Sequence, residues 1–99
     1  MGQVRSLTSE MLRYMIAIAD AGSISGAAAT ANISQPALSQ CMAEVEKELG
    51  QKLFARLNRG VELTDCGRIF INNARAMLFV EEQMARDLAK LKAKEHNCE

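Results

Sequence analysis

The sequence predicts a mainly α-helical fold of three short helices, a small β-hairpin and one long final helix. Apolar residues recur at helical spacing in four stretches, and a glycine or asparagine follows each of the first three. Between the third and fourth stretches, apolar residues alternate on both sides of a turn sequence, which is typical of a hairpin. The 99 residues leave room for one small core.

The first helix is expected over residues 9–21. Thr8 or Ser9 can cap its start, because a hydroxyl oxygen there accepts a free backbone N–H of the first turn. Glu10 suits the positive end of the helix dipole. Gly22 can end the helix, because glycine adopts the left-handed conformation without a steric cost.

The second helix is expected over about residues 24–31, with Ser23 or Ser25 as its cap. Its many alanines keep the cross-section small, so that a neighbouring backbone can approach closely. Asn32 can take the left-handed conformation that ends the helix. The cap of the next helix follows within two residues, which predicts a tight turn between the second and third helices.

The third helix is expected over residues 35–49. Ser34 can cap it, and Pro36 fits its first turn, where a missing N–H is no loss. Gly50 can end it. One face carries an apolar stripe and is expected to point to the core. This stripe consists of Leu38, Cys41, Met42, Val45 and Leu49.

The hairpin is expected over residues 53–63, with its turn at Asn58, Arg59 and Gly60. It follows two short helices that are joined by a tight turn, and the second of these begins with small polar residues. This order of elements is a winged helix-turn-helix, in which the hairpin is the wing.

The final helix begins after Thr64 and continues without proline to about Lys94, some 45 Å at about 1.5 Å per residue. So small a domain cannot bury all of it, and its apolar residues repeat at coiled-coil spacing. We therefore expect it to pair with the same helix of a second copy. Glu81 interrupts the repeat, which predicts a short, imperfect seam. The expected dimerisation residues are Phe70, Ala74, Met77, Met84, Leu88 and Leu91.

These expectations divide the chain into three parts. Residues 1–64 form the winged helix-turn-helix, residues 65–95 form the linker helix that joins two subunits, and residues 96–99 form a tail.

The exposed face of the third helix is the candidate DNA-reading surface. A step of about 100° per residue places Pro36, Gln40, Ala43 and Lys47 opposite Leu38, with Ser39 at the edge. Glutamine offers the paired donor and acceptor that match adenine, serine can contact a base or a phosphate, and Pro36 and Ala37 can meet a thymine methyl. The candidate set on this helix is Ser34, Gln35, Pro36, Ala37, Ser39, Gln40, Ala43 and Lys47.

The hairpin adds three polar candidates, Arg56, Asn58 and Arg59. Arginine suits phosphates and the narrow minor groove, where the negative potential is enhanced. The overall charge does not add to this interpretation, because twelve basic residues balance twelve acidic ones. An alternative therefore stays open, in which the chain is a protein interaction or dimerisation module that has lost DNA binding.

Other function classes find little support in the sequence. It has no paired carboxylates, no Cys–His set outside the tail, no glycine-rich phosphate loop and no metal-ligand spacing, so we expect neither an enzyme nor a cofactor. Cys41, Cys66 and Cys98 are widely spaced and odd in number, which argues against a disulfide framework and fits a reducing cytoplasm. No apolar run is long enough to suggest a membrane span.

The run from Met11 to Gly67 resembles the N-terminal domain of LysR-type transcriptional regulators. The resemblance rests on LRYMIAIADAGSISGAAATANISQPALSQ and on EVEKELGQKLFARLNRGVELTDCG. The alanine-rich second helix, SQPALS, the ELG-x-x-LF turn and the R-G-V-x-LT-x-x-G wing appear in order. The resemblance implies that Ser34, Gln35, Pro36, Ser39 and Gln40 face the groove, with Arg56 and Arg59 in the wing.

The resemblance also implies a homodimer that binds a double-stranded DNA operator in the bacterial cytoplasm, associated with the nucleoid and not with a membrane. A larger C-terminal domain usually senses a small-molecule inducer and takes part in forming tetramers. That domain is missing from the 99 residues, so the chain is either a fragment, which we favour, or a naturally short protein that does not respond to an inducer by the usual route. The sequence departs from the family where arginine is common at Gln40, glutamine at Cys41 and a basic residue near Glu44.

Overall fold

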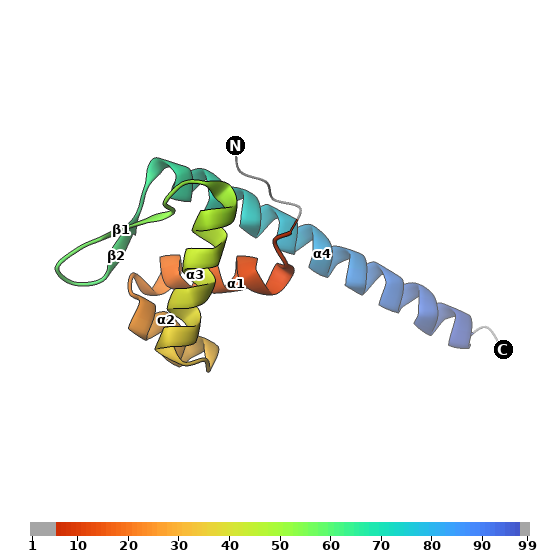
Figure 1. Cartoon of the computed structure of the whole chain (residues 1–99). Helices are drawn as coiled ribbons and strands as arrows, with labels where there is room; N and C mark the ends of the chain where they lie inside the picture. Colours follow the sequence, from red (N-terminus) through yellow and green to blue (C-terminus); the bar gives the residue numbers. More distant parts are fainter. Residues whose placement is uncertain (1–5, 98–99) are drawn as a thin grey trace.

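A computed structural model describes residues 6–97, with side-chain surroundings as far as residue 94. The elements follow in the order α1, α2, α3, β1, β2 and α4. Figure 1 shows the first three helices gathered in one cluster, with the hairpin at one side and α4 leaving as a single rod. The predicted fold class, a winged helix-turn-helix followed by a long helix, is confirmed.

The first two helices have the bounds that the sequence predicts. α1 spans Ser9–Ala21 and α2 spans Ile24–Ala31. Of the alternative caps, Thr8 is used for α1 and Ser23 for α2. Their hydroxyl oxygens accept backbone N–H groups at 3.2 and 3.0 Å. α1 ends at a left-handed Gly22 and α2 at a left-handed Asn32.

The third helix, α3, spans Gln35–Leu49 and packs its apolar stripe against α1 and α2. Leu38 and Val45 are fully buried in the core, together with Met15 and Ile18 of α1. Burying a side chain of this size stabilises a fold by about 1.5–3 kcal/mol. The stripe therefore holds α3 so that its opposite face points away from the cluster.

The hairpin is shorter than the predicted range of 53–63. β1 spans Phe54–Arg56 and β2 spans Val61–Leu63, in antiparallel register with Ala55 opposite Glu62. Leu53 is fully buried in the core instead of belonging to the strand. The backbone N–H of Leu57 donates to the carbonyl of Gly60 at 3.0 Å and closes the turn.

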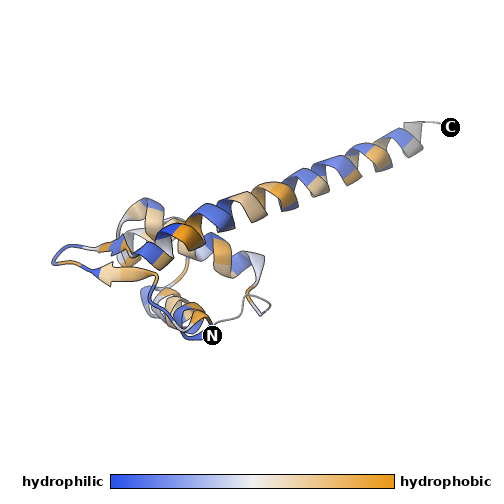
Figure 2. Cartoon of the chain, turned by 90° about the horizontal axis from the view of Figure 1, so that it is seen from above, coloured by the Kyte–Doolittle hydropathy of each residue, from blue (hydrophilic) through white to orange (hydrophobic). Residues whose placement is uncertain are grey.

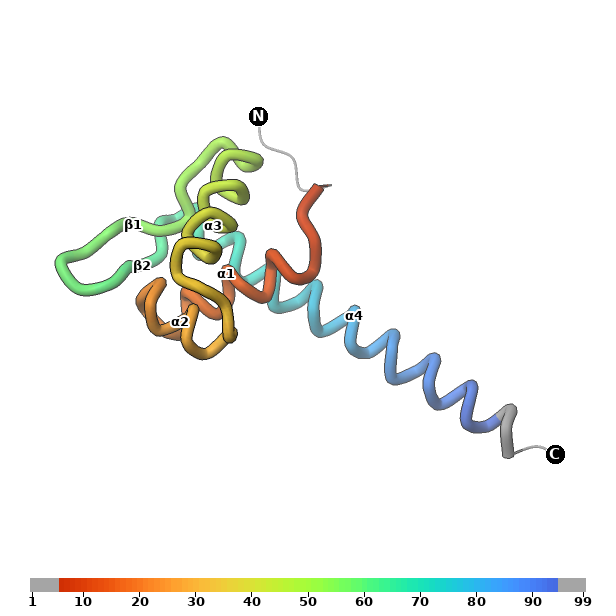
Figure 3. Tube along the Cα trace, turned by 60° about the horizontal axis from the view of Figure 1, so that its bottom comes forward, coloured from red at the N-terminus to blue at the C-terminus, as the bar shows by residue number. Residues whose placement is uncertain are grey.

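The last helix, α4, spans Asp65–Asn97 and so continues two residues past the expected boundary at 95. Thr64 caps it, since its hydroxyl oxygen accepts the N–H of Gly67 at 3.0 Å. Its first turns pack on α1, and the rest projects alone, as the tube view in Figure 3 makes plain. Apolar and polar residues alternate along the projecting part in Figure 2. Of the expected tail, residues 98–99 lie outside the described part of the chain.

Two ion pairs join α1 to α4 where the long helix leaves the cluster. Arg13 contacts Glu81 at 2.9 Å, and Asp20 contacts Arg75 at 2.5 Å. Ser9 also donates a hydrogen bond to the Glu81 carboxylate. Glu81, which interrupts the apolar repeat in the sequence, therefore takes part in the contact between α4 and α1. Exposed pairs of this kind each stabilise by at most about 1 kcal/mol, so they serve mainly to fix orientation.

Candidate nucleic-acid interface

The free face of α3 carries the residues that the sequence selects for DNA reading. Seven of the eight candidates are exposed, and the eighth, Ser39, is half-buried at the edge of the face. The hydroxyl oxygen of Ser34 accepts the N–H of Ala37 at 3.2 Å, so this side chain caps the helix. The exposed candidates are Ser34, Gln35, Pro36, Ala37, Gln40, Ala43 and Lys47.

The wing places its three polar candidates at the edge of the molecule. Arg56, Asn58 and Arg59 are all exposed, and among the residues with described side chains none of the three is in an ion pair. Their charges and donors are therefore available to a partner. Arg56 ends β1, while Asn58 and Arg59 lie in the turn.

The turn of the wing rests directly on the turn between α1 and α2. The N–H of Val61 donates to the carbonyl of Gly22 at 2.9 Å. Gly60 has a positive φ of 89°, and a Cβ there would lie 2.1 Å from the same carbonyl oxygen. Only glycine fits such a close approach of two backbones, so Gly60 fixes the position of the wing relative to the helices.

A buried carboxylate joins α3 to the wing, and the sequence analysis did not single it out. Glu46 is 6% exposed, and its Oε2 accepts the N–H groups of Leu53 at 2.7 Å and Phe54 at 3.3 Å. The Lys52 ammonium lies 3.7 Å from the other carboxylate oxygen. The sequence does hold a signal for Glu46. This residue comes one position after Val45 of the apolar stripe and just before the ELG turn.

Thr64 and Gly67 complete the base of the wing. The Thr64 hydroxyl donates to the carbonyl of Lys52 at 2.6 Å. A Cβ on Gly67 would lie 2.0 Å from the carbonyl oxygen of Leu53. The LT-x-x-G part of the sequence thus has a physical reason, because it packs the start of α4 against the segment that leads into β1.

Comparisons with known proteins place this geometry in a family. The sequence model described as "Bacterial regulatory helix-turn-helix protein, lysR family" matches residues 9–68. The chain therefore belongs to the LysR family of bacterial regulatory helix-turn-helix proteins. It is 41% identical over 75 residues to the HTH-type transcriptional regulator TfdT of Cupriavidus pinatubonensis, covering 76% of this chain and 33% of TfdT.

Further relatives extend the match in sequence and in structure. The nitrogen assimilation regulatory protein nac of Escherichia coli is 49% identical over 72 residues, which are 73% of this chain and 24% of nac. The crystal structure of the CbnR_DBD–DNA complex has a TM-score of 0.80 and 34% identity to this chain, covering 88% of this chain and 99% of that one. A BenM_DBD complex with benA site 1 DNA has a TM-score of 0.82 and 32% identity, covering 86% and 99%.

In this LysR-family chain, the expected dimerisation residues fall into two groups. Ala74 is only 2% exposed and Phe70 is half-buried, because both lie in the part of α4 that packs on its own domain. Ala74 is therefore buried within the single subunit, and its contact with a partner helix stays a prediction. The other four remain 55–59% exposed, and they are Met77, Met84, Leu88 and Leu91.

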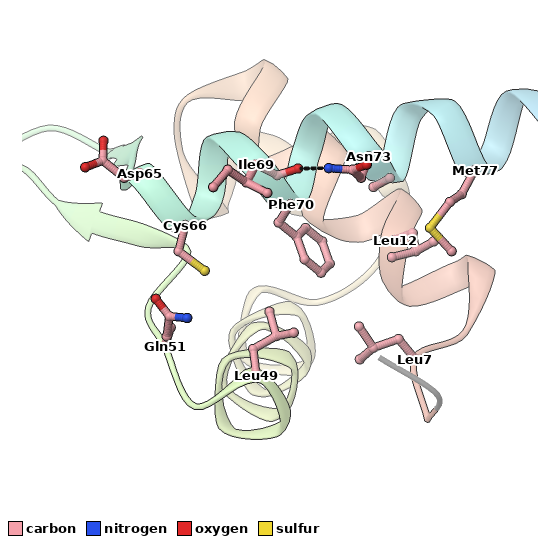
Figure 4. Close-up of a pocket in the computed structure, with 11 residues that line it drawn as sticks. Leu7, Leu12, Leu49, Gln51, Asp65, Cys66, Ile69, Phe70, Asn73 and Met77 are labelled. Atoms are coloured by element: carbon pink, nitrogen blue, oxygen red, sulfur yellow. Dashed lines mark hydrogen bonds between the residues drawn. The ribbon is translucent and has the colours of Figure 1, made fainter. Parts of the chain in front are cut away.

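An apolar hollow of about 550 Å³ lies where α4 crosses the ends of α1 and α3. In Figure 4, Phe70 and Met77 of α4 line one side, with Leu49 of α3 and Leu7 from before α1 on the other. Met77 belongs both to this hollow and to the exposed apolar residues of α4. The two surfaces are therefore continuous.

The described cysteines are unpaired and half-buried, namely Cys41 on α3 and Cys66 on α4. Burial, with the nearby charges of Glu44 and Glu10, raises the pKa of the Cys41 thiol. The thiolate is the reactive form, so this environment disfavours reaction at neutral pH. Cys98 lies outside the described residues.

Among the residues that the structure describes, no three His, Cys, Asp or Glu side chains come together as a metal site would require. None of the helices found there has the length and hydropathy needed to cross a membrane.

Proposed function

We propose that this chain reads operator DNA for a bacterial LysR-type transcription regulator. In this proposal, α3 enters the major groove and the wing contacts the backbone or the minor groove. The main support is the exposed polar face of α3, which the fully buried Leu38 and Val45 hold outward on the opposite side. The work proposed for the chain is binding, without a catalytic step or a cofactor, at the nucleoid in the cytoplasm.

The geometry of α3 suits this role because the major groove of B-DNA admits one helix and displays a distinct pattern for every base pair. The first turns of α3 carry Gln35, Ser39 and Gln40, whose side chains can hydrogen bond to base edges. Arg56 and Arg59 lie on a wing that Gly60 and Glu46 hold in a fixed place beside α3. Phosphate contacts from these arginines would set the register of α3 on the duplex.

The second part of the proposal is a homodimer formed through α4. Met77, Met84, Leu88 and Leu91 line the projecting helix, and the apolar hollow continues their surface. The α4 helix of a second copy would cover both the exposed apolar residues of α4 and the apolar hollow. A two-fold dimer presents two recognition helices, so its operator would be an inverted repeat with half-sites a whole number of helical turns apart.

The chain spans about a quarter to a third of the length of TfdT and nac. Control of transcription by a whole regulator is therefore proposed for the longer protein to which such a DNA-reading domain belongs. We place inducer binding and tetramer formation outside the 99 residues, in a C-terminal domain of the kind that the family resemblance implies.

The test is selection from a pool of random duplexes by the purified chain at several salt concentrations, with its mass in solution measured alongside. Enrichment of an inverted repeat by a species of twice the chain mass is the expected result. Binding should weaken steeply with salt, because phosphate contacts release counterions. Weak binding at low salt without enrichment would contradict DNA reading and favour the alternative of an interaction module.

A further inference from the structure

A carboxylate stands on the reading face of α3 beside a residue proposed to contact bases. Glu44 is exposed and lies one helical turn after Gln40. The Gln40 Nε2 group donates to Glu44 Oε1 at 3.5 Å. Among the described residues, Glu44 takes part in no ion pair. Its charge is therefore not neutralised by a basic side chain within the described residues.

This contact changes what Gln40 can offer to a base. A free glutamine presents a donor and an acceptor side by side, the pattern that matches adenine. Here one N–H of the amide points to Glu44. The second N–H and the carbonyl oxygen of Gln40 remain available, and so does the second carboxylate oxygen of Glu44, which can only accept. Glu44 therefore adds to the amide a group that only a donating base edge can meet.

Only two base edges donate in the major groove, the N4 amine of cytosine and the N6 amine of adenine. The adenine amine lies beside N7, an acceptor that would face the carboxylate without a proton between them. Cytosine itself presents only its amine there, with O6 of the paired guanine on one side, and a Glu or Asp side chain that accepts from N4 is the matching contact for this base. Guanine and thymine present acceptors to the groove from O6 and O4. Cytosine therefore fits the pair best.

We propose that Gln40 and Glu44 form a specificity-determining pair that accepts a hydrogen bond from cytosine N4 in the operator half-site. The proposal rests on the proposed function, since it requires α3 in the major groove. Glu44 would then contact a base directly. From the sequence alone, Glu44 is only a departure from the basic residue that is common near this position in the family.

The negative charge adds to discrimination at sites that lack the cytosine. A carboxylate near the phosphates weakens binding to every sequence, and it recovers that loss only where a base amine meets it. DNA without the cytosine therefore lacks the hydrogen bond to Glu44, while the repulsion between this carboxylate and the phosphates remains. The pair lowers nonspecific affinity while it raises the ratio of specific to nonspecific binding.

The experiment compares Glu44→Ala and Glu44→Gln with the unmodified chain. Each binds the selected operator and a set of duplexes in which every position of the half-site is changed to each other base pair. Glu82→Gln is the control for charge, because Glu82 is exposed on α4, far along the chain from the reading face. Circular dichroism checks that all variants are folded.

For the unmodified chain, we expect one half-site position at which replacing C·G weakens binding about tenfold or more. Glu44→Ala should reduce that preference below about twofold and leave preferences at other positions unchanged. Glu44→Gln keeps an acceptor oxygen and should keep part of the preference. Both variants should bind random DNA more tightly than the unmodified chain, and Glu82→Gln should change neither quantity.

Two results would overturn the pair as a base reader. One is a C·G preference that survives Glu44→Ala. The other is an equal gain in affinity for all sequences with every preference unchanged, which would make Glu44 a repulsive charge alone. An unmodified chain that selects no sequence is a different outcome, because it overturns the proposed function as well as this inference.

Discussion

The Glu46 carboxylate of α3 accepts the backbone N–H of Leu53, the residue that leads into the wing, at 2.7 Å. The same oxygen accepts the N–H of Phe54 at 3.3 Å, so one side chain serves two backbone donors at the start of the wing. This relationship links the recognition helix to the wing through a single buried group. Because of this link, the position of the wing on DNA depends on the position of α3.

Replacing Glu46 by alanine should destabilise the domain by about 1–3 kcal/mol, because two buried N–H groups lose their acceptor. Glu46→Gln keeps a carbonyl oxygen in nearly the same place and should cost less. Urea unfolding, followed by circular dichroism, measures both. Equal unfolding midpoints for the alanine variant and the unmodified chain would show that water replaces the carboxylate without loss.

Gly60→Ala should destabilise the domain more than Gly50→Ala, although both glycines have positive φ. An L-residue in the left-handed region costs about 1–2 kcal/mol, and this term applies to each. A Cβ at Gly60 would in addition meet the Gly22 carbonyl oxygen, while nothing lies within 4 Å of one at Gly50. Thermal unfolding measures the difference. Similar losses of stability for the two variants would contradict the close contact between Gly60 of the wing and the Gly22 carbonyl.

Gln40→Ala should weaken binding to the preferred operator by about 1–3 kcal/mol and leave binding to random DNA almost unchanged. The reason is that a base contact contributes only where the matching base is present. Fluorescence anisotropy with both duplexes measures the two affinities. Equal losses on operator and random DNA would exclude base reading by this side chain.

Arg59→Ala should lower affinity for all sequences alike. A phosphate contact carries no sequence information, and removing one should reduce the slope of log affinity against log salt by about one. The measurement is a salt titration of binding to operator and random duplexes. A loss confined to the operator, with the slope unchanged, would instead place Arg59 against bases.

Leu88→Glu should convert the proposed dimer to a monomer, because it puts a charge into the apolar seam of α4. Phe79→Glu is the matched control, since Phe79 is 61% exposed and lies on the other side of the helix from Met77. Sedimentation equilibrium gives the masses. A dimer that survives Leu88→Glu but is lost with Phe79→Glu would move the interface to the opposite face.

Much of the fold follows from local signals in the sequence. The bounds of α1, α2 and α3 agree with their caps and with the left-handed Gly22, Asn32 and Gly50, because each signal acts on a backbone only a few residues away. The exposed face of α3 follows from helical periodicity for the same reason. The family resemblance agrees with both, and with the wing that the order of the elements predicts.

What the sequence does not reveal depends on contacts between distant residues. Glu46 looks like one acid among several near the end of α3, and only the fold brings Leu53 and Phe54 to it. Ala74 has coiled-coil spacing, yet it is only 2% exposed within the single chain, on the helix whose first turns pack on α1. Periodicity predicts the apolar face of α4. It does not predict the residue at which α4 stops packing on its own subunit and becomes available to a partner helix.

Protection of guanine N7 from methylation on the selected operator tests most directly whether α3 enters the major groove, because N7 lies in that groove. A bound dimer should protect two patches, one in each half-site, separated by a whole number of helical turns. Leu88→Glu should abolish this protection at concentrations where the variant is a monomer. Unprotected guanine N7 atoms on an operator that the chain occupies fully would contradict the placement of α3 in the major groove.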